Sequence, residues 1–496
     1  MKNYSLEHFF RQNKHTLDPK ELAWSVVLTG FEQNNYPARS LATYNKALFE
    51  HNIRFLPLES NTTEPSFFIL DPYNSVRAIL YPTLIEPIEP QDLINIIQLL
   101  SHEDNSKTTV NPDASKETPP APNASNEITA APKNIVIPEV PSDNASRTEI
   151  HYLDNQPINI NCPSLKRVVG EYVLGDPSNV DAILLDFAIY AFALIKPTGE
   201  FEVYSKRHLQ QLSDLRFANP NLKILLAVGG WAAEGFSDAA LTPSSRFDFA
   251  REAQKWVNEY NLDGIDLDWE YPGSSVSGIK SRPQDTENFT FLLDSLRQVL
   301  GPNKIITVAG SGSREYISKV QISKIAEFIN YFNIMSYDFT AGETGAGAVK
   351  HQSNLFESNL SLRGISTNAY VTNLINAGMP PEKLLMGVPF YGRRGATSTK
   401  TYDEIRGFYL NKNGYAVKWD DQAKSPYIID ANGNFAFSFD NELSIYFKGQ
   451  YIFDKCLGGM FSWQSNFDNS NLLSSAMYNA VNDPRQLEAI LKTYYA

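Results

Sequence analysis

The feature that most constrains the fold is a regular alternation of strand-like and helical stretches, which begins near Ser164 and continues almost to the end of the chain. Helical patterns separate short apolar runs, and such runs are typical of buried parallel strands. Eight runs are present, at Arg167–Tyr172, Ala182–Ala193, Lys223–Val228, Gly264–Asp268, Lys304–Ala309, Tyr331–Tyr337, Lys383–Pro389 and Gly458–Trp463. Eight strands in about 330 residues favour a closed (β/α)8 TIM barrel over an open sheet. The predicted helices between them include Ser245–Tyr260, Thr286–Leu300 and Thr367–Ala377.

Three further parts of the chain have their own character. The long gap between the seventh and eighth runs predicts a small α+β insertion at about residues 394–455, within a barrel domain at 150–496. Residues 103–149 are rich in Pro, Ser, Asn and Ala and poor in apolar side chains, which predicts a disordered linker. Residues 1–102 are interpreted as a small α+β accessory domain through which a protein partner would bind; a carbohydrate-binding role is the weaker alternative. Its predicted helices are one opening at Asp18-Pro19 and running through Val27, Pro37–His51 and Pro90–Leu100, and its predicted strands are Ser66–Leu70 and Ser75–Tyr81.

Composition excludes several classes of protein. The net charge is −13 and no basic cluster occurs, so nucleic acid is not an expected partner. Two cysteines make no disulfide framework, and the seven histidines lack metal-ligand spacing, so neither a metal nor another cofactor is expected. No apolar stretch is long enough to span a membrane, and the start of the chain lacks the apolar core of an export signal. The expected location is therefore either the cytoplasm or, after export by another route, the outside of the cell.

The fourth apolar run carries the chemistry. Asp266, Asp268 and Glu270 alternate with Ile265, Leu267 and Trp269, and successive strand residues point to opposite faces, so the three carboxyls share one face. Neighbouring buried carboxyls cannot all remain ionised, which raises at least one pKa and suits proton transfer. A hydrogen-bonded acidic ladder or half of a divalent-metal site is the alternative. Glu270 falls at the carboxyl end of the run, where TIM barrels place catalytic groups.

Motifs in other runs accompany this acidic stretch in order along the chain. Together they resemble a chitinase of glycoside hydrolase family 18, over roughly residues 166–480. The matching segments are Asp263-x-x-Asp266-x-Asp268-x-Glu270, Tyr190-Ala-Phe192-Ala, Val228-Gly-Gly-Trp231, Met335-Ser-Tyr337-Asp338, Thr344-Gly with His351-Gln-Ser-Asn-Leu355, Gly387-Val-Pro-Phe-Tyr391-Gly-Arg393 and Gly458-Gly-Met-Phe-Ser-Trp463.

The resemblance implies hydrolysis of chitin or chitooligosaccharides with retention, by attack of the substrate's own 2-acetamido oxygen. Glu270 would be the acid and then the base, Asp268 would orient the acetamido N–H, Asp266 would share a proton with Asp268, and Tyr337 would hold the acetamido oxygen. Trp463 would form the floor under the sugar. The other residues expected to bind substrate are Trp231, Met335, Asp338, Tyr391, Arg393, Tyr172, Phe192 and Tyr271. Trp269 is interpreted as packing.

Two departures from the family pattern stand out. Ala227 occupies a position where the family usually has a Ser whose hydroxyl supports the buried Asp equivalent to Asp266. Asp266 would then titrate differently, or another group or water would replace that hydroxyl. The segment between Arg393 and Tyr402 is short, so one wall of the cleft is expected to be low.

Three other interpretations remain open. A chitinase-like lectin would keep the barrel and bind chitin without cutting it, although such proteins generally lose the acid that Glu270 supplies. An endo-β-N-acetylglucosaminidase of N-glycans or a peptidoglycan hydrolase would use the same catalytic groups on another substrate. The catalytic domain would also function as cargo if residues 1–102 were a docking or delivery module.

Overall fold

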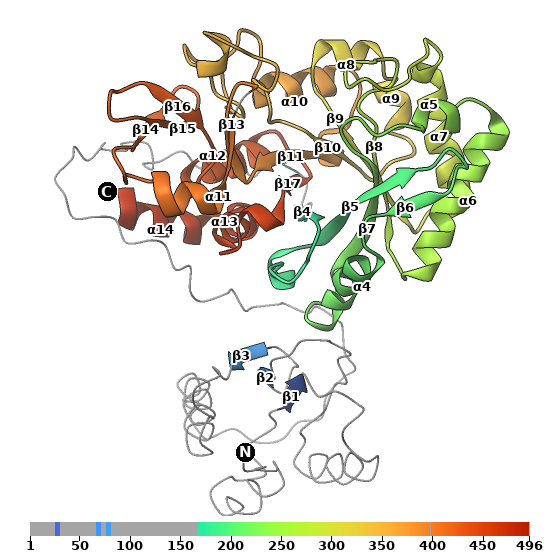
Figure 1. Cartoon of the computed structure of the whole chain (residues 1–496), viewed down its shortest axis with the longest axis horizontal. Helices are drawn as coiled ribbons and strands as arrows, with labels where there is room; N and C mark the ends of the chain where they lie inside the picture. The colour runs from blue at the N-terminus through green and yellow to red at the C-terminus, as the bar shows by residue number, and fades with distance from the viewer. Residues whose placement is uncertain are drawn as a thin grey trace, which may run out of the picture. The chain divides into compact units, whose positions relative to one another are not determined.

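The computed structural model describes residues 25–29, 66–70, 76–80, 162, 166–396 and 398–495 (Figure 1). The chain divides into two compact units, residues 1–130 and 131–496. In the described part of the first unit, β1 (Ser25–Thr29), β2 (Ser66–Leu70) and β3 (Val76–Leu80) form an antiparallel sheet in that order. The strands β2 and β3 confirm the two predicted there.

The helix predicted to open at Asp18 and to run through Val26 and Val27 is wrong at β1. Val26 and Val27 pair with Ile69 and Phe68 of β2, and β-branched side chains favour this extended, paired conformation. The predicted helices 37–51 and 90–100 and the linker 103–149 lie outside the described residues, so the domain boundaries stay predictions.

The described part of the second unit contains a closed barrel of eight parallel strands, which confirms the predicted (β/α)8 architecture. In their order around the barrel the strands are β4 (Val168–Leu174), β17 (Gly459–Trp463), β11 (Leu384–Pro389), β10 (Tyr331–Ile334), β9 (Ile305–Gly310), β8 (Gly264–Asp268), β7 (Lys223–Gly229) and β5 (Phe187–Ile195), which pairs back to β4. A short strand, β6 (Phe201–Val203), extends β5 as an antiparallel hairpin.

Two predicted strand limits were wrong by more than two residues. The second predicted strand begins at Phe187 because Ala182–Leu184 form a 3-10 helix, whose amide at Ile183 is capped by the Asp181 side chain. The sixth predicted strand ends at Ile334, and Asp338 beyond it adopts a left-handed backbone with φ of 59°. The chain therefore leaves the sheet before Tyr337.

Helices alternate with these strands, as the sequence predicts. α6 begins at Pro243 because the Thr242 hydroxyl accepts from the Ser245 amide and Pro at the first helical position has the required φ. Besides α11, which is described below, the α-helices in the described part of the chain are α4 (Lys206–Asp214), α5 (Phe236–Ala239), α6 (Pro243–Glu259), α7 (Asp285–Leu300), α8 (Arg314–Ser318), α9 (Ile322–Ile325), α10 (Thr367–Asn376), α12 (Glu442–Asp454), α13 (Leu472–Asn482) and α14 (Pro484–Tyr495). Short 3-10 helices lie at Leu215–Phe217, Gly347–Val349, Pro381–Lys383 and Ser465–Phe467.

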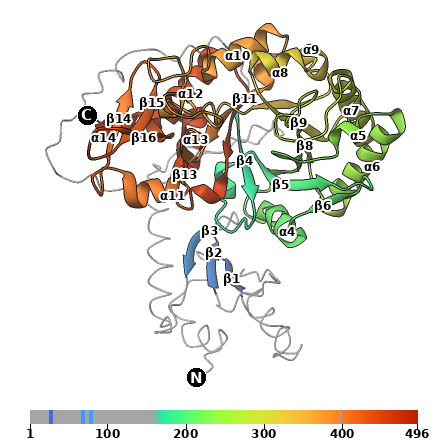
Figure 2. The ribbon, with the colours of Figure 1, turned by 45° about the horizontal axis from the view of Figure 1, so that its top comes forward.

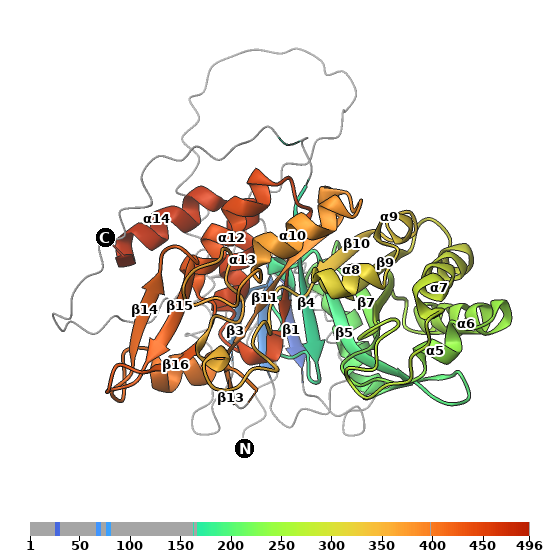
Figure 3. The same cartoon turned by 90° about the horizontal axis from the view of Figure 1, so that it is seen from above.

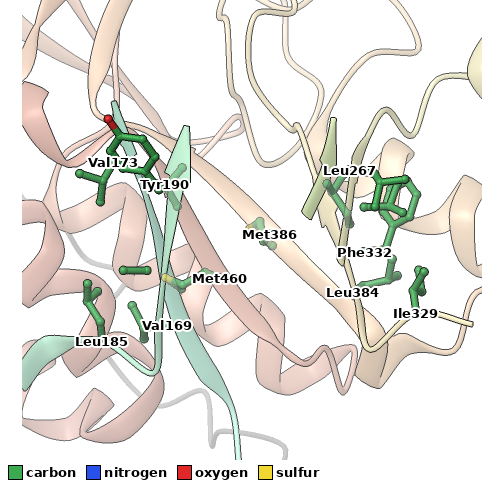
Figure 4. Close-up of a cluster of buried hydrophobic side chains, with 14 of the residues drawn as sticks. Val169, Val173, Leu185, Tyr190, Leu267, Ile329, Phe332, Leu384, Met386 and Met460 are labelled. Carbon is green, nitrogen blue, oxygen red and sulfur yellow. The ribbon is translucent and has the colours of Figure 1, made fainter. Parts of the chain in front are cut away.

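The alternation along each strand separates two apolar layers. The larger lies between the strands and the helices and contains Leu267 and Trp269 of the acidic stretch. Figure 4 shows part of it, where Val169, Tyr190, Leu267, Phe332, Met386 and Met460 come from six barrel strands. The smaller layer lies inside the barrel and is made of strand residues of the opposite parity, including Tyr172, Ala227 and Phe461. Asp266 and Asp268 share that inward parity, so the fold directs both carboxyls into the barrel.

The segment between β11 and β17 carries a second, antiparallel sheet. Its order in the described chain is β13 (Ser398–Thr401), β12 (Tyr391–Arg394), β16 (Phe435–Ser438), β15 (Ser425–Ile429) and β14 (Ala416–Asp420), with α11 (Tyr402–Glu404) and a π-helical turn (Ile405–Tyr409) after β13. The sheet begins three residues before the predicted insertion. Figures 1, 2 and 3 show β14–β16 at the opposite side of the barrel from α6 and α7.

Cys162 and Cys456 form a disulfide between the segment before β4 and the turn before β17. The sequence did not predict this pairing. Since β4 and β17 are neighbours in the barrel, the disulfide joins the chain near the amino ends of the first and last barrel strands. Among the helices that the structure describes, none has the length and apolar character needed to cross a membrane.

Candidate active site

The acidic stretch lies at the carboxyl end of β8. Asp266 and Asp268 are buried inside the barrel, with 0% and 4% of their surface exposed. Glu270 follows two residues after Asp268, and the Ser277 hydroxyl donates to its carbonyl oxygen at 2.7 Å. On the other face, Trp269 stacks on Phe236 with 5.3 Å between ring centroids and meets the edge of Phe289 at 5.6 Å. Trp269 therefore packs away from the carboxyls.

Asp266 accepts hydrogen bonds from three neutral side chains. Thr307 Oγ1 donates to Oδ1 at 2.5 Å, Tyr172 OH donates to Oδ2 at 2.8 Å, and Asn333 Nδ2 donates to Oδ1 at 3.2 Å. Burial raises the pKa of Asp266 to about 6, and these three hydrogen bonds oppose the rise. The surrounding barrel therefore stabilises the ionised form of a carboxyl that it has removed from water.

Asp268 has the opposite environment. Among the described residues, no group donates a hydrogen bond to its Oδ1. Burial, followed by the charges of Glu270 and Asp266, raises the pKa of Asp268 well above its usual range. Burial also raises the pKa of Glu270 to about 7, although a hydrogen bond from Tyr271 opposes the rise. The carboxyl end of β8 and the residues just after it thus hold three carboxyls with different proton affinities.

Asp338 forms a second polar group beyond the end of β10. Its Oδ1 accepts from Tyr391 OH at 2.7 Å and from Arg393 Nε at 2.6 Å. Tyr337, next to it, packs its ring against the edges of Tyr391 and Phe461. Burial and the nearby charges of Asp268, Asp338 and Glu270 raise the pKa of Tyr337 well above 10, so its hydroxyl stays protonated beside these carboxyls. Met335 lies against the apolar layer inside the barrel.

Aromatic side chains line the same end of the barrel. Trp463, the last residue of β17, stacks on Phe192 at 5.6 Å and is tilted against Tyr172 at 5.5 Å. Trp231, just after β7, is 60% exposed, and Tyr271 meets the edge of Tyr316. Large exposed aromatic faces are available for apolar sugar faces to stack upon.

The structure brings the predicted site residues to one end of the barrel, but two of those expected to bind substrate are buried. Tyr172 is only 1% exposed and its hydroxyl is taken up by Asp266, which leaves it little surface for a ligand. Tyr391 is also buried and reaches the site through Asp338. Among the described residues, no group of three or more His, Cys, Asp or Glu could hold a metal ion.

Thr307 and Asn333 were not predicted as site residues. Both are polar, fully buried residues within strands that are otherwise apolar, Ile305–Gly310 and Tyr331–Ile334. Their inward parity was available from the sequence. Their contact with Asp266 depends on the register in which β8, β9 and β10 pair, which the sequence of one strand alone does not reveal.

Comparison with known proteins gives independent support for the family resemblance found in the sequence. The sequence model described as "Glycosyl hydrolases family 18" matches residues 168–468. Chitinase A1 of Niallia circulans is 33% identical over 308 residues, which cover 54% of this chain and 44% of that protein. Chitotriosidase-1 of Mus musculus is 31% identical over 330 residues, which cover 59% of this chain and 69% of that protein. The match thus spans less than half of Chitinase A1.

Solved structures are similar over the same region. The chitinase domain of the spore coat protein CotE from Clostridium difficile is 55% identical, with a TM-score of 0.52, covering 69% of this chain and 99% of that one. A family 18 N-acetylglucosaminidase from Paenibacillus barengoltzii is 31% identical, with a TM-score of 0.59, covering 63% and 99% respectively. In each case the similarity includes the barrel and leaves about a third of this chain unmatched.

Proposed function

The chain belongs to glycosyl hydrolase family 18, and on that premise we propose that its barrel is a chitinase. It hydrolyses β-1,4 linkages between N-acetylglucosamine units of chitin or chitooligosaccharides with retention of configuration. The observation that carries the proposal is the graded set of carboxyls on β8 and just after it. Asp266 has three hydrogen-bond donors, whereas Asp268 and Glu270 have environments that keep a proton near neutral pH.

Glu270 is the general acid and base. With a pKa raised to about 7 by burial, it carries a proton at mildly acidic pH and delivers it to the leaving glycosidic oxygen. The resulting carboxylate then takes a proton from the attacking water. A catalytic pKa close to the working pH suits both steps.

The nucleophile comes from the substrate. Many glycosidases place a second carboxylate across the sugar from the acid, but family 18 enzymes use the 2-acetamido oxygen instead. In the described site, Asp266 and Asp268 lie on β8 just before Glu270, and Asp338 is bound by Arg393 and Tyr391. The acetamido oxygen attacks the anomeric carbon, an oxazolinium ion forms, and water opens it with net retention.

Three side chains orient the acetamido group. Asp268, which lacks a donor to Oδ1 among the described residues, turns to accept the acetamido N–H and stabilises its developing positive charge. Asp266 takes part of the proton that Asp268 held. Tyr337 donates its hydroxyl to the acetamido oxygen, and such alignment of reacting atoms contributes several kcal/mol to lowering the barrier.

Aromatic and polar residues bind the sugar chain. Trp463, backed by Phe192, forms the floor at the cleavage point, and Trp231 offers an exposed face further along the cleft. Met335 and Tyr271 complete the walls, and Tyr391 acts by holding Asp338. The Asp338–Arg393 pair supplies hydrogen bonds to sugar hydroxyls.

Release of 4-methylumbelliferone from its chitobiose and chitotriose conjugates tests this proposal on the full chain. Replacing Glu270 by Gln removes the proton donor and keeps the shape, so we expect kcat to fall by about 10²–10⁴-fold. Glu287→Gln, at an exposed position on α7, is the matched control and should leave turnover unchanged.

Other outcomes would select the alternatives. Absence of turnover with tight chitooligosaccharide binding would identify a lectin, for which the intact acid gives no support. Cleavage of a glycoprotein or of peptidoglycan in preference to chitin oligomers would identify another activity of the family.

We also propose that residues 1–102 bind a partner and take no part in hydrolysis. A chain starting at Ile150 keeps both cysteines and the whole barrel, so it should retain the turnover of the full chain. A large loss of turnover in this soluble fragment would assign the first 149 residues a role in the reaction.

A further inference from the structure

We propose that Thr307 is a positioning residue for the reaction, which supplies from β9 the hydroxyl that β7 lacks at Ala227 and holds Asp266 ready to accept a proton from Asp268. This inference rests on the proposed function. It adds a residue outside the motifs that identify the family in this chain.

The strand register places the two positions symmetrically. Ala227 on β7 and Thr307 on β9 are both register partners of Asp266 on β8, one on each side. Ala227 has no hydrogen-bonding side chain and packs in the apolar layer inside the barrel. Thr307 is fully buried, and its hydroxyl lies 2.5 Å from Oδ1 of Asp266. A hydroxyl from one neighbour therefore reaches the carboxyl where the other neighbour offers only a methyl group.

The other two donors do not duplicate this contact. Tyr172 donates to the other oxygen, Oδ2. Asn333 reaches Oδ1 at the longer distance of 3.2 Å, and the same amide nitrogen also donates to Tyr172 OH at 3.0 Å. Thr307 consequently supplies the shorter of the two hydrogen bonds to Oδ1.

The contact determines which carboxyl of the pair holds the proton. A hydrogen bond to the ionised form of a carboxyl favours that form, so Thr307 keeps Asp266 as the acceptor while Asp268 keeps the proton. The ionisable groups that act on the pair are Tyr172 on β4 and, through Asp268, the side chains of Glu270, Tyr271, Tyr316 and Tyr337. Neither Ala227 on β7 nor Asn333 on β10 can ionise.

Thr307→Val keeps the shape of the side chain and removes its hydroxyl. Because a hydrogen bond to a charged group is worth somewhat more than one pKa unit, we expect the acidic limb of the kcat/KM profile to move up by about one pH unit. At about pH 5 to 6 the variant should then lose about tenfold in kcat/KM, and the loss should shrink as the pH rises. Thr307→Ser, which keeps the hydroxyl, should retain the wild-type limb.

A double variant tests directly whether a hydroxyl on β7 can replace the one on β9. Ala227→Ser with Thr307→Val places a hydroxyl at the other register partner of Asp266, so the acidic limb should return toward its wild-type position. Thr290→Val is the matched control, because it removes a buried threonine hydroxyl on α7 that donates to Gln321, the residue just before α9. It should leave the pH profile unchanged even where it lowers stability.

A readout without turnover separates this inference from the proposed function. In the wild type the pKa of Asp266 is raised on folding, so stability falls as the pH rises from the pKa of this residue in the unfolded chain toward about 6. In Thr307→Val this fall should continue to higher pH, so the deficit in melting temperature relative to wild type should be wider at neutral than at acidic pH. Wild-type protein without turnover would overturn the proposed function alone. The role of Thr307 would be overturned if Thr307→Val had the same acidic limb as Thr307→Ser. It would also be overturned if the two variants had the same melting-temperature deficit at every pH.

Discussion

At the scale of single residues, the environment of each carboxyl decides its task more than its identity does. Asp266 and Asp268 are the same residue type two positions apart on β8, yet three donors surround the first and none reaches Oδ1 of the second among the described residues. Their proton affinities differ for that reason. Glu270 lies two residues after Asp268, and burial raises its pKa to about 7.

The pKa of Glu270 predicts the alkaline limit of activity. Burial raises that pKa to about 7, and the negative charge of Asp338 raises it further. Since the acid must carry a proton, kcat should fall as pH rises through about 7. Asp338→Asn removes the charge, so the alkaline limb should move to lower pH by a fraction of a unit. A pH profile of kcat for both proteins is the measurement, and an unmoved limb in the variant would show that another group sets it.

Glu171 gives a stability prediction at the same scale. This carboxyl on β4 points outward, is fully buried and accepts a hydrogen bond from the Ser474 hydroxyl. Burial raises its pKa to about 8. Between its ordinary pKa and about 8, the unfolded chain has lost this proton and the native protein has kept it, so stability falls as pH rises across that window.

Glu171→Gln removes the titration. The variant should lose less stability than wild type between about pH 5 and 8, and at about pH 8 it should be more stable by a few kcal/mol or less. Urea unfolding at several pH values measures this difference. A wild-type stability that is flat across the window would contradict the raised pKa.

At the scale of elements, buried polar groups join the insertion to the barrel. Asp440, just before α12, accepts from Lys448 Nζ at 2.8 and 2.9 Å and from Ser444 Oγ at 2.6 Å. Ser353, in the segment that follows β10, donates to the same carboxylate. Nearby, His351 Nε2 lies 3.0 Å from Asp420 on β14. The segment His351–Leu355, known from the sequence only as a family motif, therefore connects barrel and insertion.

The Lys448–Asp440 ion pair should be sensitive to removal of one partner. Both side chains are 1% exposed, and Lys448→Met leaves a buried carboxylate without its counter-ion, which destabilises by about 3–5 kcal/mol. The double change Lys448→Met with Asp440→Asn should recover part of that loss. Lys418→Met, at an exposed position on β14, is the control for loss of a lysine. Chemical unfolding of the four proteins measures the coupling, and equal losses in the two lysine variants would contradict it.

The periodicity of apolar residues and the alternation of side chains along strands made most elements predictable from the sequence. The eight barrel strands follow from short apolar runs between helical patterns, and the inward face of Asp266 and Asp268 follows from alternation. Contacts between distant parts of the chain were not predictable in this way. Thr307 meets Asp266 only because β8 and β9 pair in one particular register, and Cys162 meets Cys456 only because the barrel closes. The extended β1 replaced a predicted helix because pairing with β2 outweighed the capping pattern at Asp18-Pro19.

At the scale of the whole molecule, the disulfide secures the closure of the barrel. It spans 294 positions of sequence and joins the segments that enter β4 and β17, which are paired neighbours. Both strands enter the barrel at its amino end, whereas Glu270 follows the carboxyl end of β8. The bond thus lies at the end of the barrel away from the acid, and its effects on stability and on catalysis are separable.

Replacing Cys162 by Ser should therefore lower stability and leave the chemistry alone. Removal of a crosslink that closes a long loop destabilises by about 2–4 kcal/mol, which should appear as a lower melting temperature and a lower denaturant midpoint. At about 25 °C, kcat on the chitobiose conjugate should stay within about twofold of wild type, because the bond lies before the amino ends of β4 and β17 and Glu270 follows the carboxyl end of β8. A reducing agent should lower the melting temperature of the wild type to that of Cys162→Ser and should not change the variant. If the oxidised wild type and the variant unfold together, the bond contributes nothing to closure; if kcat falls as well, the two ends of the barrel are coupled.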